Sequence, residues 1–131
     1  MSVRIFIVDD NPVNLKLASS VLEMAGYIVA TAVDAEQAQE MLKSITPDLI
    51  LMDIALPGMD GLTLARALRV DPRLKHVPIV AMTAFCSSPF MAKARDAGCE
   101  GYITKPIDTR KLSEQLAAYL RQNADNERSC Q

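Results

Sequence analysis

Five side chains of this sequence have the types that chemistry on a phosphoryl group requires. Each stands at the end of a short apolar run or directly after it, and the five are Asp9, Asp10, Asp53, Thr83 and Lys105. Two adjacent carboxylates repel each other, and burial disfavours their charged forms, so a pair placed after an apolar run needs a cation. A site made of hard oxygen ligands suits Mg²⁺, which keeps several of its waters.

These residue types suit phosphoryl transfer to a carboxylate. An aspartate can act as a covalent nucleophile toward phosphorus and form an aspartyl phosphate. The transfer depends on positioning and on neutralising the charge of the phosphoryl oxygens, which a metal ion and Lys105 can do, while the hydroxyl of Thr83 can donate a hydrogen bond. Neither GxxxxGK[ST] nor GxGxxG occurs in the sequence, so a nucleotide is not the expected donor.

The elements that must position these side chains can be read from the hydrophobic pattern. Three of the five apolar runs are nearly continuous in Val, Ile, Leu and Met, which is typical of parallel strands buried on both faces. The predicted strands are Val3–Val8, Ile28–Ala32, Leu49–Met52, Ile79–Met82 and Gly101–Ile103.

Segments of helical period lie between and after these strands. Asn11, followed by proline, predicts a helix start, and so do Asp34 and Asp108. Gly26 and Gly98 stand where helices are expected to end. Five βα units predict an α/β fold with a parallel sheet and helices on both faces. The predicted helices are Pro12–Met24, Asp34–Ser44, Leu62–Leu68, Pro89–Ala97 and Asp108–Gln122.

Ligands of open parallel sheets bind outside the carboxyl ends of the strands, so the five side chains are expected at one edge. Each also has a plainer interpretation. Asp9 or Asp10 could cap the next helix, and so could Thr83, whereas Asp53 and Lys105 could belong to turns. Because all five follow strands of one sheet, a common site is the preferred interpretation.

The bulk composition bounds the remaining functions. The 131 residues suit one domain, expected at residues 1–122, with a polar, frayed tail at 123–131. The net charge of -2 and the absence of a basic run argue against direct nucleic-acid binding. No apolar run approaches the roughly 18 residues of a membrane span. The three cysteines lack CxxC spacing, which predicts reduced thiols in a cytoplasmic protein.

Four segments resemble the receiver domain of two-component response regulators, the superfamily of the bacterial chemotaxis response regulator. They are "VDDN", "LILMDIALPGMDG", "MTA" and "YITKP", and the resemblance extends over residues 3–121. "DDNPVN" and "GCEGYITKPI" are most similar to single-domain cell-cycle receivers and to receivers of hybrid histidine kinases. The resemblance implies a (βα)₅ flavodoxin-like fold with strand order 2-1-3-4-5. A stand-alone protein and a receiver cut from a hybrid kinase fit equally.

The resemblance also implies a role for each acidic residue. Asp53 would accept a phosphoryl group from a phosphohistidine on a sensor or hybrid histidine kinase or on a histidine phosphotransfer protein. Asp10 and Asp53 would ligate Mg²⁺ directly, and Asp9 largely through water. The backbone carbonyl of Ala55 would be a further ligand. The protein would then be a phosphoacceptor in signalling rather than an enzyme acting on other substrates.

By the same resemblance, Lys105 would pair with the phosphoryl group, and Thr83 would move toward it. Tyr102 would rotate between outward and inward positions. The Lys105–Pro106 bond would be cis. A downstream protein would bind the face formed by the fourth helix, fifth strand and fifth helix, which the sequence predicts to include Phe85, Phe90 and Tyr102. Ordinary burial of Phe90 remains equally open.

The sequence departs from the family pattern at two places. Ala55 and Phe85 follow Asp53 and Thr83 by two residues, where many relatives carry polar groups. The bulk of Phe85 is expected to shield the phosphoryl group, which predicts slow self-dephosphorylation. Glu100 is followed by glycine where gene regulators usually have a second acid, so their dimer is not expected, and a monomer or weak dimer is predicted.

Three other classes compete with this interpretation. A metal-dependent phosphatase or dehalogenase would usually have an acid at position 55, and it would need a cap over its pocket. A flavin-binding electron carrier would need a loop rich in Ser, Thr and Gly after the first strand, where two acids would repel a phosphate. A degenerate receiver that acts without phosphorylation would lack part of the set of acids, threonine and lysine.

Overall fold

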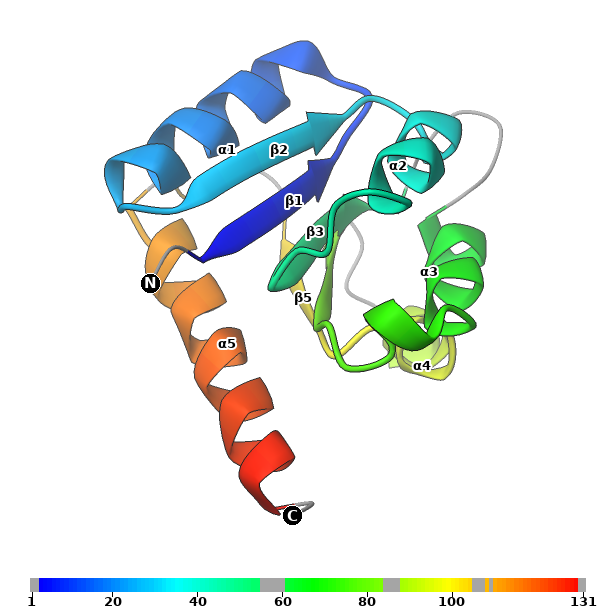
Figure 1. Ribbon diagram of the computed structural model, residues 1–131. Helices are drawn as coiled ribbons and strands as arrows, with labels where there is room; N and C mark the ends of the chain where they lie inside the picture. The colour runs from blue at the N-terminus through cyan, green and yellow to red at the C-terminus, as the bar shows by residue number, and fades with distance from the viewer. Residues whose placement is uncertain (1–2, 55–60, 84–87, 105–107, 109, 130–131) are drawn as a thin grey trace.

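The computed structural model describes residues 3–54, 61–83, 88–104, 108 and 110–129. Within them, strands and helices alternate along the chain, and the five strands form one parallel sheet in the order β2-β1-β3-β4-β5. The predicted flavodoxin-like α/β fold is therefore confirmed (Figure 1). The elements are β1 (Arg4–Val8), α1 (Pro12–Met24), β2 (Ile28–Ala32), α2 (Ala35–Leu42), β3 (Leu49–Asp53), α3 (Gly61–Arg69), the 3₁₀ helix η1 (Pro72–Leu74), β4 (Ile79–Thr83), α4 (Ser88–Asp96), β5 (Gly101–Thr104) and α5 (Leu112–Ser129).

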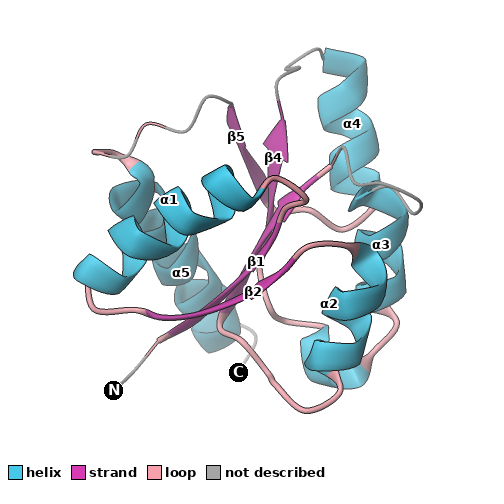
Figure 2. Cartoon of the chain, turned by 90° about the horizontal axis from the view of Figure 1, so that it is seen from above, coloured by secondary structure: helices cyan, strands magenta, loops and turns pink. Residues whose placement is uncertain are grey.

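The sheet is the middle layer of three. Helices α1 and α5 cover one face, and α2, α3 and α4 cover the other (Figures 1 and 2). Successive side chains of a strand point to opposite faces, so Ile5 and Ile7 of β1 pack with α1 and α5, whereas Phe6 and Val8 belong to the core on the other side. Two apolar cores result, one on each face of the sheet.

Burial explains why the central strands read as continuous apolar runs. Every residue of β3 and β4 is buried, as are the last four of β1. The edge strands β2 and β5 have mixed burial. None of the helices among the described residues is long and apolar enough to cross a membrane.

Strand register brings the predicted site residues to one level. Val8 of β1 pairs with Met52 of β3, and Asp53 pairs with Met82 of β4. Because the strands are parallel, Asp9 comes level with Asp53, and Thr83 follows one residue further along β4. The acidic residues therefore lie together at the carboxyl ends of the strands, as the sequence predicts.

Four residues that were predicted to start or end helices lie at helix ends in the structure. The side chain of Asn11 accepts hydrogen bonds from the N–H groups of Val13 and Asn14, at 2.9 and 3.3 Å. Asp34 caps α2 in the same way. Gly26 and Gly98 have φ angles of 98° and 103°, a left-handed conformation that ends α1 and α4 at little steric cost.

Helix α5 differs from its predicted extent at both ends. Asp108 closes a turn ahead of the helix, because its carbonyl oxygen accepts a hydrogen bond from the N–H of Leu112 at 3.0 Å. At the other end the helix continues past Gln122 to Ser129. The helix thus extends seven residues beyond its predicted end at Gln122. Residues 123–129 contain neither glycine nor proline, the two residues that most strongly disfavour a helix interior.

Arg69 lies near the amino ends of β4 and β5, at the opposite end of the strands from the acidic residues. Burial lowers the pKa of its guanidinium from the ordinary value, and Glu100, 3.8 Å away, opposes that shift. Through its hydrogen bonds, the guanidinium group links the end of α3 to the loops that lead into β4 and β5. Its nitrogens donate hydrogen bonds of 2.6 to 3.1 Å to four backbone carbonyl oxygens, those of Leu74, Lys75, Val77 and Gly98.

Candidate functional site

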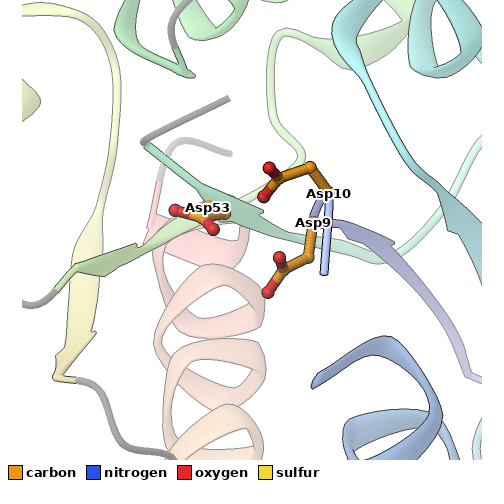
Figure 3. A group of neighbouring side chains, drawn as sticks. All are labelled: Asp9, Asp10 and Asp53. Carbon is orange, nitrogen blue, oxygen red and sulfur yellow. The ribbon is translucent and has the colours of Figure 1, made fainter. Parts of the chain in front are cut away.

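Three carboxyl groups meet at the carboxyl ends of β1 and β3. One oxygen each of Asp9, Asp10 and Asp53 lies within 4.8 Å of the others, and Figure 3 shows the three side chains gathered at this point. Negative charges so close together repel one another, and a cation among them relieves the repulsion. The spacing suits one hard cation bound directly or through its waters, so the acidic triad could hold a metal ion.

The two adjacent aspartates have different surroundings. Asp9 is fully buried, whereas Asp10 is exposed. A carboxylate oxygen of Asp9 accepts a hydrogen bond from the N–H of Asn11 at 2.9 Å, which orients it at the start of α1. The N-cap of α1 is Asn11, so the plainer interpretation of Asp9 or Asp10 as that cap does not hold.

Asp53 is the last residue of β3 and only 4% exposed. The start of α3 packs directly behind it, where the N–H of Gly61 donates to the carbonyl oxygen of Ile54 at 2.9 Å. A Cβ at Gly61 would lie 2.6 Å from Ile54 Cα and 2.7 Å from the carbonyl oxygen of Asp53. Only glycine allows this approach. Gly61 was not predicted to have a role, although a glycine at the start of a helix was a visible signal.

Thr83 and Tyr102 lie on the neighbouring strands. Thr83 ends β4 and is 7% exposed, and it pairs with Thr104 of β5. Tyr102 pairs with Ala81 and is 39% exposed. The structure thus brings Thr83 to the same edge as Asp53 and leaves Tyr102 on an edge strand that solvent can reach.

Several predicted residues lie outside the described part of the chain. The predictions for them stay predictions. They are Ala55, Phe85, Lys105 and Pro106, together with the side chain of Phe90, whose backbone belongs to α4.

A parallel five-stranded fold with an acidic triad at the carboxyl edge defines a class of signalling protein. The family model of the response regulator receiver domain matches residues 5–117, and the chain belongs to that family. Receiver domains are phosphoacceptors of two-component signalling that work with histidine kinases, and they are not classical enzymes. This membership excludes the phosphatase and flavin-carrier alternatives.

Individual relatives agree with the family. The polar-differentiation response regulator DivK of Brucella ovis is 38% identical over 120 residues, which cover 92% of this chain and 98% of DivK. The chemotaxis response regulator CheY4 of Vibrio cholerae superposes with a TM-score of 0.87 at 27% identity, over 90% of this chain and 98% of that one.

A relative with bound metal bears on the acidic triad. The receiver domain of sensor histidine kinase PA1611 from Pseudomonas aeruginosa has a TM-score of 0.83 and 32% identity, over 92% of this chain and 98% of that one. Its structure has a magnesium ion coordinated in the active site cleft. This chain is therefore a receiver-type response regulator with an acidic site typical of Mg²⁺-dependent phosphoacceptance.

Proposed function

We propose that Asp53 is the phosphoacceptor of this response regulator. The donor is a phosphohistidine on a sensor or hybrid histidine kinase, or on a histidine phosphotransfer protein. One observation carries the proposal. The nearly buried carboxyl group of Asp53 ends β3 with an oxygen within 4.8 Å of oxygens of Asp9 and Asp10. Among these acids, Asp53 is the one that stands on the central strand, between the ends of β1 and β4.

The transfer forms one bond and breaks one. A carboxylate oxygen of Asp53 attacks the phosphorus, and the bond between phosphorus and the donor imidazole nitrogen breaks. The electron pair of that bond leaves with the nitrogen. The hydroxyl of Thr83, at the end of the adjacent strand, donates a hydrogen bond to a phosphoryl oxygen. Lys105 pairs with another, and this role rests on the family resemblance.

The acidic triad holds Mg²⁺ in this proposal. As the family resemblance implies, Asp10 and Asp53 would ligate the ion directly, Asp9 would act largely through water, and the backbone carbonyl of Ala55 would complete the protein's set. The fit rests on three carboxylates at one point, since oxygen ligands are those Mg²⁺ prefers. The bound ion would offset the charge of the phosphoryl oxygens. Asn11 holds the carboxylate of Asp9 in place for this role.

Phosphorylation switches a binding face. The added charge draws Thr83 toward the phosphoryl group, and Tyr102 turns into the space that Thr83 leaves. A downstream protein in the cytoplasm reads the change at a face that includes Phe85, Phe90 and Tyr102 and involves no direct contact with nucleic acid. Phe85 shields the phosphoryl group, so the phosphorylated form loses it slowly.

Intact-mass analysis after incubation with acetyl phosphate tests the proposal. We expect one phosphoryl adduct with Mg²⁺ and none without it. The variant Asp53→Asn forms no adduct, because the amide cannot act as the nucleophile. The control Asp96→Asn removes an exposed carboxylate at the end of α4 and is expected to retain the adduct.

Two results would contradict the proposal. An adduct that persists in Asp53→Asn would place the acceptor elsewhere. The lack of any adduct with acetyl phosphate and with several phosphorylated histidine kinases, in protein that still binds Mg²⁺, would identify a receiver that acts without phosphorylation.

A further inference from the structure

The C-terminal end of α4 is built into the apolar core on its face of the sheet. Ala94, Ala97 and Cys99 are all buried there. The N–H of Gly98 donates a hydrogen bond of 3.0 Å to the carbonyl oxygen of Arg95. The N–H of Cys99 donates one of the same length to the carbonyl oxygen of Ala94. Packing and backbone hydrogen bonds therefore both hold this end of the helix.

A side chain of the neighbouring helix reaches the same end. Helix α3 lies beside α4 (Figures 1 and 2), and its last residue is Arg69, whose Nε and Nη2 both donate to the carbonyl oxygen of Gly98, at 3.0 and 2.7 Å. The stem of the arginine lies against the same glycine, because a Cβ at Gly98 would be 2.6 Å from Arg69 Cγ. A positive group at the C-terminal end of a helix also interacts favourably with the helix dipole. Gly98 is thus the point at which α3 holds α4.

The remaining nitrogen of the guanidinium group holds the chain that leads into β4. Nη1 of Arg69 donates to the carbonyl oxygens of Leu74, Lys75 and Val77, at 3.1, 3.1 and 2.6 Å. The side chain is only 19% exposed, so water competes little for these charged hydrogen bonds. One planar group therefore ties the end of α4 to the start of β4. The hydrogen bonds of Arg69 to these three carbonyls and to that of Gly98 are called the α4 clamp.

The two ends of α4 adjoin different parts of the molecule. Thr83 ends β4 at the carboxyl edge of the sheet, and α4 begins at Ser88, five residues further along the chain. The nine residues of α4 extend about 13 Å, back toward the amino ends of β4 and β5. The first turn of the helix is thus connected closely to Thr83, and its last turn lies next to the α4 clamp.

We propose that the α4 clamp makes Arg69 a positioning residue of the phosphorylation switch. The inference rests on the proposed phosphorylation of Asp53. When the phosphoryl group draws Thr83, the clamped end of α4 stays in place, so the helix tilts about Gly98 instead of shifting as a whole. The largest change of the binding face then falls at the first turn of α4. A rigid helix with one fixed end is a physical connection that can carry coupling between two sites.

Amide hydrogen exchange of the unphosphorylated chain, followed for each residue by NMR, tests the clamp itself. The change Arg69→Gln removes the charged donor from the carbonyl oxygen of Gly98 and frees this end of α4. We expect the amides of Gly98 and Cys99 to exchange at least about tenfold faster, because local opening becomes easier. Arg69→Lys keeps the charge without the planar fork and is expected to exchange nearly as fast.

Arg73 supplies a matched control. It stands four residues after Arg69 and donates hydrogen bonds to the carbonyl oxygens of Leu42 and Lys43, at the end of α2. Arg73→Gln makes the same change of side chain. We expect it to speed exchange at the amide of Ser44, just after α2, and to leave the end of α4 unchanged. This pair of variants separates the α4 clamp from a general loss of stability.

Phosphorylation of the natural chain by acetyl phosphate with Mg²⁺ tests the tilt without any variant at the clamp. We expect amide exchange to change at residues 88–91, in the first turn of α4, and to stay the same at Gly98 and Cys99. In Arg69→Gln the change is expected to spread to the end of the helix, since the clamp is lost. Asp53→Asn takes no phosphoryl group and is expected to show neither change.

Two results would overturn the proposal. Unchanged exchange at Gly98 and Cys99 in Arg69→Gln would show that the clamp does not hold α4. Phosphorylation that alters these amides of the natural chain as much as residues 88–91 would show that the helix moves as a whole, and this result decides the matter if Arg69→Gln does not fold. A chain that takes no phosphoryl group instead contradicts the phosphoacceptor proposal and removes the tilt, whereas exchange of the unphosphorylated chain still decides whether the clamp holds α4.

Discussion

Two adjacent acidic residues of this protein differ sharply in their surroundings. Asp9 is buried and accepts the N–H of Asn11, whereas Asp10 beside it is exposed. Their carboxylates nevertheless reach the same point near Asp53. Asp9 is therefore held in place by the fold, whereas Asp10 supplies a charge that solvent can reach.

Cys99 permits a prediction about pH at the same scale. The residue is 7% exposed, and burial raises the pKa of its thiol from 9.0 to about 11, although Arg69 nearby opposes the shift. Between these values the unfolded chain loses the proton while the folded chain keeps it. The free energy of unfolding therefore falls as pH rises from 9 to 11, by at most about 3 kcal/mol from this group.

Urea unfolding across that pH range, with and without Cys99→Ala, isolates the contribution. The natural chain is expected to lose more stability than the variant over the same interval. In a Cys86→Ser/Cys130→Ser background, the Cys99 thiol is expected to react slowly with a disulfide reagent at pH 8 until the protein is unfolded. Equal pH slopes for the two proteins would show that the thiol is not shielded.

At the scale of elements, the site depends on how closely α3 approaches the end of β3. Gly61 opens α3 against the backbone of Asp53 and Ile54. The start of α3 therefore constrains the backbone of Asp53, the proposed phosphoacceptor. The close approach of Gly61 therefore shapes the surroundings of Asp53, although glycine has no side chain to contribute.

Gly61→Ala tests this contact. Helix propensity alone predicts that alanine stabilises α3, whereas the close approach predicts a loss of about 1–3 kcal/mol, because backbone atoms must move. We also expect slower phosphorylation by acetyl phosphate. The control Ala67→Gly, at an exposed site of the same helix, is expected to lose about 1 kcal/mol without affecting phosphorylation. A stabilised Gly61→Ala variant would refute the contact.

At the scale of the whole molecule, the sheet packs between two apolar cores, and the two ends of its strands carry different features. At the amino ends of β4 and β5, Arg69 donates hydrogen bonds to backbone carbonyl oxygens. The three acids lie at the carboxyl ends of β1 and β3. Among the described side chains of α5, the fully buried ones are Leu112 and Leu116. The packing of this helix on the sheet is therefore concentrated in its first turns.

Truncation measures where the domain ends. A chain that stops at Gln122 keeps both of these leucines and is expected to lose less than about 5 °C in Tm, with phosphorylation by acetyl phosphate unchanged. A chain that stops at Gln115 lacks Leu116 and is expected to lose cooperative unfolding, since an internal cavity replaces a buried side chain. Loss of folding in the longer chain would extend the domain beyond residue 122.

Much of the fold was predictable because its signals are local. Continuous apolar runs predicted β3 and β4, and Asn11, Asp34, Gly26 and Gly98 predicted helix ends through hydrogen bonds or φ angles that involve only near neighbours. The end of α5 was predicted wrongly, because polar composition alone does not stop a helix.

By itself the sequence determined which residues follow each strand, and hence that Asp9, Asp10 and Asp53 share an edge of a parallel sheet. Only the tertiary structure decided that Asp9 is buried and Asp10 exposed, and that the backbone of Asp53 lies too close to Gly61 for a side chain there. The physical reason is range. Strand propensity and capping act between near neighbours in the chain, whereas burial and close approach depend on residues that only the folded sheet brings together.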